Sequence, residues 1–234
     1  DGMKLSLQQW RSLPPIVHQS HIALLHVFQL FVELQEAGQM CTLLLDTNAN
    51  NFESRFQELK ALLQSWRERL PNYWDDMNRW SDLVSWRQLM FGAINRTFLP
   101  LGPLLPPTVT ANNAAASGVA GSSLAYRGYH EMAWMINRFA RIARKHGMLD
   151  GCTSQLERID TLPKIEIHEA FIKLKEQARC NLKNLGELAS GLEVINNTNL
   201  AYFGVRQKAE FFTLKGDFLA RLDRNDEANT AYAD

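Results

Sequence analysis

The chain has 234 residues, of which 46% are hydrophobic, so it can bury the core of one large domain or of two small ones. Lysine plus arginine and aspartate plus glutamate each number 25, and this balance excludes an overall field that would attract nucleic acid or an anionic membrane. The longest apolar run, 22–34, is interrupted by polar residues and is too short to span a bilayer, so we expect an intracellular chain.

The first third of the chain shows helical periodicity in its apolar residues. Ile16–Leu45 predicts one long helix that follows two prolines, with Gly38 as the point where it could break. A turn-rich connector over Asp46–Asn51 leads to a second amphipathic helix over Phe52–Arg69, which Pro71 ends.

Four of the six tryptophans lie within Ser65–Arg87. A tryptophan is a large apolar body with a single N–H donor, so this cluster predicts a buried seam between helices rather than a ligand cage. The third predicted helix is capped by Asn72 and runs to about Phe98, with Asp75 and Asp76 in its first turn. The four tryptophans are Trp66, Trp74, Trp80 and Trp86.

The composition changes between Leu99 and Ser123, where Pro, Gly, Ala, Ser and Asn dominate. Such a segment cannot support a packed element, and a loop longer than about 15 residues is unusual inside a compact unit. We therefore expect helical hairpins over 1–98, a flexible loop over 99–123, and more helices over 124–234, divided at Gly147, Pro163 and Asn196-Asn197. No segment shows the alternation of a strand, and the predicted fold class is all-α.

Two stretches of the last part follow the spacing of the tetratricopeptide repeat, in which small residues on both helices of a hairpin allow close antiparallel packing. Their turns are Lys145-His146-Gly147 and Asp223–Asp226. The array has no polar capping helix after its last hairpin, so we expect a piece of a longer α-solenoid. The first copy comprises Ile136, Ala140, Ala143, Cys152 and Leu156, and the second comprises Phe212, Gly216, Leu219, Ala228 and Tyr232.

Longer segments carry a family resemblance over nearly the whole chain, apart from 99–123. The segments are WRSLP (Trp10–Pro14), ELQEAGQ (Glu33–Gln39), SWRERLP with the DD and WRQ that follow it (Ser65–Gln88), IARKHGMLD (Ile142–Asp150), GLEVINNTNLAYF (Gly191–Phe203) and AEFFTLKGDFLA (Ala209–Ala220). They resemble the FAT region of the phosphatidylinositol-3-kinase-related kinase family, and within it the branch of TRRAP-type transcription-associated pseudokinase scaffolds.

The resemblance implies an α-solenoid of tetratricopeptide-like and HEAT-like repeats that curls around a kinase-like domain of the same chain. It also implies a nuclear, structural and non-catalytic role, without a cofactor, in SAGA and related histone acetyltransferase complexes. The implied partners are other subunits of these complexes, transcription activators and that kinase-like domain, with no direct contact to nucleic acid or membrane.

Two other classes of function stay open. A free-standing tetratricopeptide adaptor would bind short acidic peptides, although the array lacks a capping helix. An enzyme would be a helical hydrolase, or an active kinase of the same family of which this is the FAT region. The sequence contains no GxSxG elbow, no phosphate-binding P-loop, and no HRD or DFG kinase motif.

The histidines and cysteines do not predict a metal site. His18 and His21 can share a helix face, but His26 lies about 80° around the helix from His18, and no carboxylate completes a set at HExxH-like spacing. The cysteines form no CxxC pair and have no histidine nearby, so we expect free buried thiols in a reducing compartment. They are Cys41, Cys152 and Cys180.

One group of charges predicts a protein-binding surface. Arg138, Arg141 and Lys145 lie at positions i, i+3 and i+7 of the helix that carries the first repeat copy, with Arg144 beside them. Repeats of this kind present first-helix residues to their ligands, so a basic stripe there would receive an acidic peptide. The alternative is a solvated face whose positive charges suit the C-terminal end of a helix.

Overall fold

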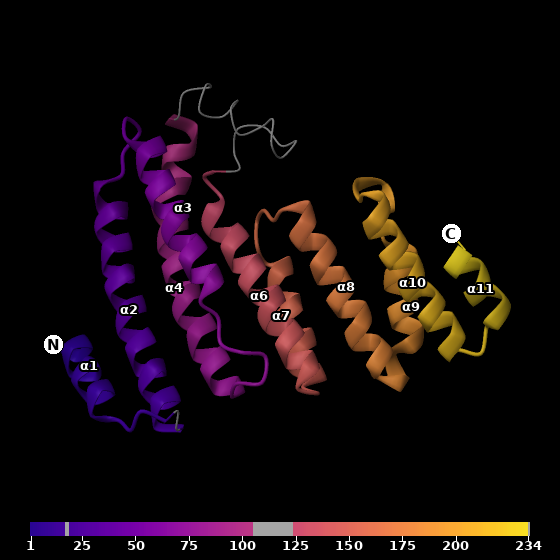
Figure 1. Cartoon of the computed structure of the whole chain (residues 1–234). Coiled ribbons are helices and arrows are strands. Elements are labelled where there is room, and N and C mark those ends of the chain that lie inside the picture. The colour runs from indigo at the N-terminus through magenta and orange to yellow at the C-terminus, as the bar shows by residue number, and fades with distance from the viewer. Residues whose placement is uncertain (17–18, 105–123, 234) are drawn as a thin grey trace. The chain divides into compact units, whose positions relative to one another are not determined.

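The computed structural model describes residues 1–16, 19–104 and 124–233, and within these ranges the chain forms helices and no strands (Figure 1). The prediction of an all-α fold is confirmed. The α-helices are α1 (Gly2–Ser12), α2 (Gln19–Asp46), α3 (Phe52–Glu68), α4 (Met77–Leu101), α6 (Arg127–Lys145), α7 (Leu149–Asp160), α8 (Ile167–Lys183), α9 (Leu188–Asn197), α10 (Val205–Arg221) and α11 (Asn225–Ala233). Short 3-10 helices occur at η1 (Gly102–Leu104), η2 (Leu185–Glu187) and η3 (Leu200–Tyr202).

The helices form two compact units. The first contains Asp1–Leu70 and the described part of Leu99–Gly121, and the second contains Pro71–Phe98 and the described part of Ser122–Asp234. The segment 71–98 therefore packs with the later helices, although the sequence analysis grouped it with the first ones. α4 and η1 extend the helical structure to Leu104, and the rest of the predicted loop, 105–123, lies outside the described residues.

In the first unit, α2 runs without a break through Gly38, and α3 ends one residue before the predicted end. α1 was not predicted. It runs antiparallel to α2, because Gly2 lies against the ring of Phe31 at one end and Trp10 meets the ring of His21 at the other, with ring centroids 5.0 Å apart. α2 and α3 form the next antiparallel pair.

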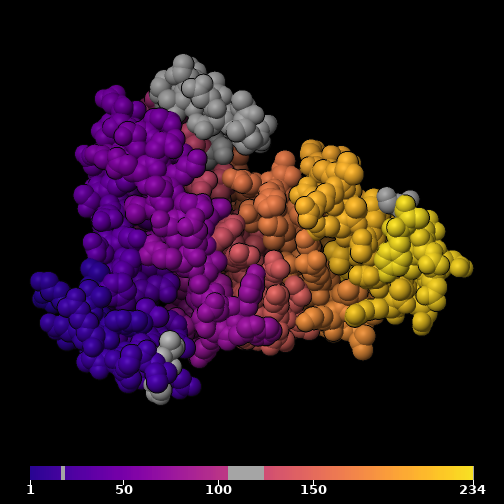
Figure 2. All heavy atoms as spheres, in the orientation of Figure 1, coloured from indigo at the N-terminus to yellow at the C-terminus, as the bar shows by residue number. Residues whose placement is uncertain are grey.

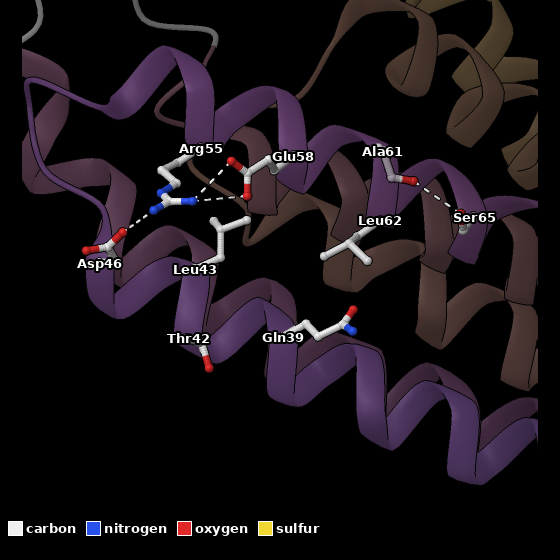
Figure 3. A pocket seen from close by; sticks show the side chains of 9 residues that line it. All are labelled: Gln39, Thr42, Leu43, Asp46, Arg55, Glu58, Ala61, Leu62 and Ser65. Atoms are coloured by element: carbon white, nitrogen blue, oxygen red, sulfur yellow. Dashed lines mark hydrogen bonds and ion pairs between the residues drawn. The ribbon is translucent and has the colours of Figure 1, made fainter.

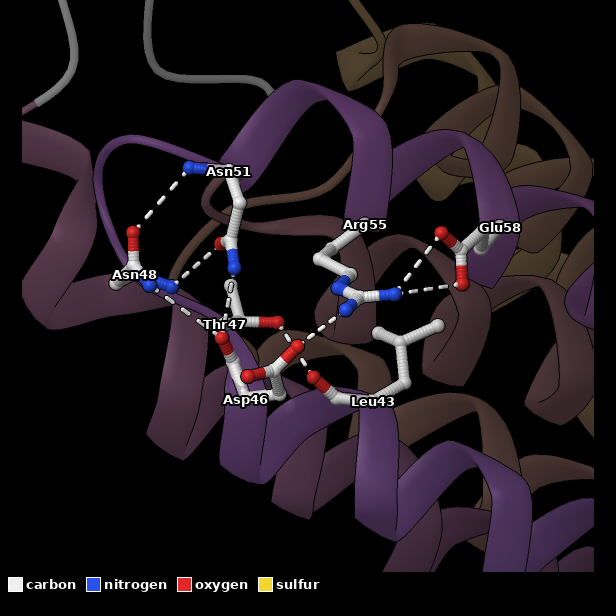
Figure 4. Close-up of polar contacts among 7 residues, drawn as sticks. All are labelled: Leu43, Asp46, Thr47, Asn48, Asn51, Arg55 and Glu58. Carbon is white, nitrogen blue, oxygen red and sulfur yellow. Dashed lines mark hydrogen bonds and ion pairs between the residues drawn. The ribbon is translucent and has the colours of Figure 1, made fainter.

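Polar side chains hold the turn between α2 and α3 (Figure 4). The backbone N–H of Asn48 donates to Asn51 Oδ1 at 2.8 Å, and Asn51 Nδ2 donates to the carbonyl oxygen of Asp46 at 2.8 Å. Arg55 pairs with the Asp46 carboxylate across the turn and with Glu58 one turn further along α3. Because Asn side chains replace missing backbone partners in a tight connection, the predicted connector is confirmed.

In the second unit, α4 and α6 approach closely at Gly128. A Cβ atom at this position would lie 2.3 Å from the carbonyl oxygen of Phe91, so only glycine fits there. The side chain of Asn95 accepts a hydrogen bond from the backbone N–H of Tyr129 at 3.1 Å, which fixes the start of α6 against α4.

The remaining helices of this unit form hairpins that follow one another in chain order, as the change from orange to yellow in Figure 2 shows for α8 to α11. α6 packs on its hairpin partner α7 and on α8, and α8 packs on α9 and on α10. This is the arrangement of tetratricopeptide-type repeats, in which the first helix of one hairpin contacts the first helix of the next.

The two predicted repeat copies share the same turn. Gly147, at φ +79°, ends α6, and the N–H of Met148 donates to the carbonyl oxygen of Ala143 at 2.9 Å. Asp223, at φ +59°, ends α10 with the corresponding bond, which runs from Arg224 to Leu219 at 2.9 Å. Both are Schellman turns, which normally take glycine at the left-handed position. Their agreement confirms the predicted break at Gly147 and the turn over Asp223–Asp226.

Side-chain packing also agrees with the repeat pattern. In the first copy all five predicted residues are buried in one cluster. In the second copy the missing side chain of Gly216 makes room for the ring of Tyr232, which a Cβ atom would meet at 2.3 Å. The predicted breaks at Pro163 and Asn196-Asn197 also separate helices, and a further break between α8 and α9 was not predicted.

Of two predictions around α4, the cap at Asn72 is wrong, and the burial of the four tryptophans is confirmed only in part. Asn72 does not cap the helix, because its N–H bonds to the Asp75 side chain at 2.9 Å in a separate turn, and α4 begins at Met77 behind Asp76, which accepts from the N–H of Asn78 at 2.9 Å. Trp74 lies in that turn and is 80% exposed, whereas Trp66 and Trp80 are buried and Trp86 is half-buried.

Candidate protein-binding surface

The predicted basic stripe lies on about the last two turns of α6. Arg138 and Arg141 are half-buried, and Lys145, at the end of the helix, is exposed. Neighbouring positions of α6 form its buried side, so the stripe occupies the border between that side and the surface.

Two of the three basic side chains meet on one aromatic ring. Lys145 Nζ lies 4.2 Å from the centroid of the Tyr73 ring, and the guanidinium carbon of Arg141 lies 6.0 Å from it. Arg138 lies one helical turn earlier, with its guanidinium carbon 5.8 Å from the ring of Trp134. Contact with an aromatic face orients a cation but does not neutralise its charge.

The neighbouring Arg144 has a different environment. Its guanidinium bonds to the Glu176 carboxylate of α8 at 2.8 Å, and the Glu176 side chain is only 2% exposed. Among the described residues, no ion pair is found for Arg138, Arg141 or Lys145. The positive charge of the stripe is therefore uncompensated, whereas Arg144 belongs to the packing between α6 and α8.

Sequence reasoning did not predict the aromatic side of this surface. Tyr73 and Trp74 come from the turn before α4. His146 Nε2 lies 2.7 Å from the carbonyl oxygen of Tyr73. Because a carbonyl oxygen only accepts, the imidazole is the donor of this hydrogen bond. The ring of Trp74 lies beside the imidazole of His146, with centroids 6.1 Å apart. The surface thus combines an exposed apolar ring with a basic stripe. The residues of the turn lie about 70 positions from the stripe in sequence, so no local spacing could indicate their contact.

The other candidate groups form no binding site in the described residues. In these ranges no group of three His, Cys, Asp or Glu side chains could hold a metal ion, and His18 lies outside them. His21 is buried against Trp10. Burial, together with the neighbouring Cys180 thiol, raises the pKa of Cys152 to about 12, which keeps this thiol protonated at neutral pH.

None of the described helices combines the length and the apolar character needed to cross a bilayer.

Comparisons with known proteins agree with the helical repeats. The family model of the FAT domain matches residues 1–234. The chain is 54% identical to the SAGA complex/NuA4 acetyltransferase complex subunit TRA1 of Saccharomyces cerevisiae and 53% identical to Tra1 of Schizosaccharomyces pombe, over 100% of its length in both cases. It is 36% identical to the human transformation/transcription domain-associated protein over 98% of its length.

The chain spans only about 6% of the length of each of these relatives. The match nevertheless runs through both compact units and includes the segments that carry the family resemblance in the sequence, so that resemblance is confirmed. The chain therefore belongs to the FAT domain family.

Proposed function

We propose that this chain is a non-catalytic scaffold segment of a large nuclear subunit of SAGA-type and NuA4-type histone acetyltransferase complexes. The observation that carries the proposal is 54% identity over the whole chain to a relative that is named as a subunit of both complexes. The stacked hairpins of the second unit support it, because such repeats supply extended surface for other proteins.

A chimeric protein tests this role. The aligned segment of Saccharomyces cerevisiae TRA1 is replaced by residues 1–234, and the subunits that copurify with the chimera are measured together with the acetyltransferase activity. We expect both to be retained, because the surfaces that hold the complex are kept. The matched control replaces the same segment by a Gly/Ser linker of equal length and should lose the copurifying subunits.

Two outcomes would count against the scaffold role. One is a chimera that accumulates normally but purifies without acetyltransferase subunits. The other is a linker control that assembles as well as the chimera, since a scaffold segment cannot be dispensable for assembly.

Within this role, the stripe of Arg138, Arg141 and Lys145 is proposed to receive an acidic segment of another subunit or of a transcription activator. Its uncompensated charge and the exposed Trp74 ring beside it support this assignment. The kinase-like domain of the same polypeptide is the third proposed partner and would contact other surfaces of the repeats.

Charge reversal tests the stripe. Arg138→Glu with Arg141→Glu should weaken binding of a glutamate-rich peptide probe at least tenfold, because attraction becomes repulsion. The matched control is Arg206→Glu, whose side chain is 94% exposed in the same unit. The assignment fails if the double variant binds the probe, the subunits and the activators as the unaltered chain does, or if the control variant loses as much.

A further inference from the structure

A groove lies between the second half of α2 and the facing side of α3, within the first unit (Figure 3). Its volume is about 860 Å³. The side chains of Leu43 and Leu62 point into the space between the two helices, and smaller groups such as Thr42 and Ala61 leave it open. The groove is thus apolar along its floor and open to one side.

This groove lies on the side of α2 that α1 covers in the first half of that helix. α1 reaches from His21, beside Trp10, to Phe31, beside Gly2, and covers nothing beyond that point. At 100° per residue, Gln39 and Asp46 lie within about 20° of His21 around the helix, so they share its face. The groove therefore continues the face of α2 on which α1 packs, in the half of α2 that α1 does not cover.

The far end of the groove carries charge (Figure 3). The Asp46 and Glu58 carboxylates share the single guanidinium of Arg55, and their side chains are 58% and 51% exposed. One negative charge remains in excess. It favours a basic side chain or the positive N-terminal end of a helix at this position, and α2 itself adds the negative end of its dipole there.

We propose that one α-helix of the same polypeptide, formed by residues that precede Asp1, fills this groove and continues the line of α1 antiparallel to α2. The proposal rests on the proposed function, in which the chain is a segment of a much longer subunit, and the relatives that it matches extend far beyond it. From Phe31 to Asp46 this uncovered face of α2 is about 22 Å long, which corresponds to a helix of about 15 residues. Such a helix presents small or apolar side chains to Leu43 and Leu62, and its N-terminal end lies at Asp46.

Cysteine labelling tests the proposal. Two proteins are compared in a Cys41→Ser background: residues 1–234, and the same chain carrying about 20 further residues of its natural sequence in front of Asp1, a helix-sized extension. Ala61→Cys places a thiol on the groove wall, and Lys60→Cys places one on an exposed part of α3 outside the groove. We expect the longer chain to react with a maleimide at least tenfold more slowly at position 61 and at an unchanged rate at position 60.

Equal labelling of position 61 in both proteins would overturn the proposal, and so would equal slowing at both positions, which indicates unspecific burial. A second variant tests the proposal through stability, without cysteine labelling. Ala61→Trp should lower the Tm of the longer chain by several degrees and leave that of residues 1–234 nearly unchanged, because the indole competes only with a helix that is present. Neither measurement involves acetyltransferase subunits, so the groove assignment can fail while the scaffold role stands.

Discussion

The two junctions between successive first helices, α6 with α8 and α8 with α10, hold equivalent places in the repeats but are stabilised by different kinds of contact. Two of the pairs across the first junction span 32 residues and the third spans 36, and the ion pair across the second junction spans 35, so both follow a repeat of similar length. The first junction is linked by polar pairs. These are His130 with Glu166 at 3.1 Å, Asn137 with Glu169 at 2.8 Å and Arg144 with Glu176 at 2.8 Å.

The second junction is aromatic. The rings of Phe171, Phe203 and Phe211 lie with their centroids 5.4 to 6.1 Å apart and are almost fully buried. Its one described ion pair, between Lys175 and Glu210, lies at the partly exposed edge. Repeats of similar length therefore do not determine which kind of side-chain contact stabilises a junction. Buried polar pairs fix one register of the two helices, whereas packed rings contribute apolar burial that tolerates small shifts.

Removing a ring should have the largest effect. Phe211→Ala deletes a side chain that is 1% exposed and leaves a cavity between α8 and α10, so we expect the free energy of unfolding to fall by about 3–5 kcal/mol. Urea denaturation measures this value. The control Val205→Ala, in the same helix but 86% exposed, should change it by less than about 0.5 kcal/mol. A loss below about 1 kcal/mol for Phe211→Ala would show that the rings do not hold this junction.

Breaking the polar junction should lower the free energy of unfolding by somewhat less. Arg144→Met removes the guanidinium from the buried Glu176 carboxylate, which among the described residues keeps Arg179, at 3.2 Å, as its ion-pair partner. We expect a loss of about 2–3 kcal/mol, below the usual range for a broken buried pair because one partner stays. Urea denaturation of single and double variants measures it.

The double variant Arg144→Met with Glu176→Met separates burial from charge. It should recover most of the loss, because two apolar side chains replace a desolvated pair, and the Arg179 side chain that loses its partner is 37% exposed and stays hydrated. If the double variant is no more stable than Arg144→Met, the loss comes from packing and not from an unpaired carboxylate.

Local sequence signals were sufficient for most of the helices. Gly147 and Pro163 interrupt the pattern through their own backbone restrictions, and the small residue at Gly216 indicated a close helix crossing, so these features could be read without a structure. α1 was missed although Met3, Leu7 and Trp10 recur at positions i, i+4 and i+7 of one helix face. The helix has only 11 residues, so its periodic signal is short.

Contacts between distant segments were not predictable from spacing. Asn72 fails as a helix cap because it lies in a separate turn, where its N–H donates to the Asp75 carboxylate at 2.9 Å, and Trp74 is exposed because it lies in the same turn. The basic stripe was predicted from helical periodicity, which places its members on one face. Its contact with Tyr73 depends on how α4 and α6 pack, and periodicity carries no information about that.

The smallest effect should come from the ion pair at the edge of the aromatic junction. The side chains of Lys175 and Glu210 are 20% and 34% exposed, so Lys175→Met should lower the free energy of unfolding by less than about 1 kcal/mol at pH 7. The hydrogen bond from Lys175 holds the pKa of Glu210 below its ordinary value of 4.5. Because a lowered carboxylate pKa stabilises the fold only above that ordinary value, the contribution is lost as the pH falls through the folded-state pKa. Urea denaturation at pH 7 and at about pH 3.5 should therefore show that the difference in the free energy of unfolding between Lys175→Met and the unaltered chain shrinks in acid.

A difference that stays constant or grows in acid would mean that the Lys175 stem packs on Phe171, 5.5 Å from its Nζ, and stabilises the junction without using its charge.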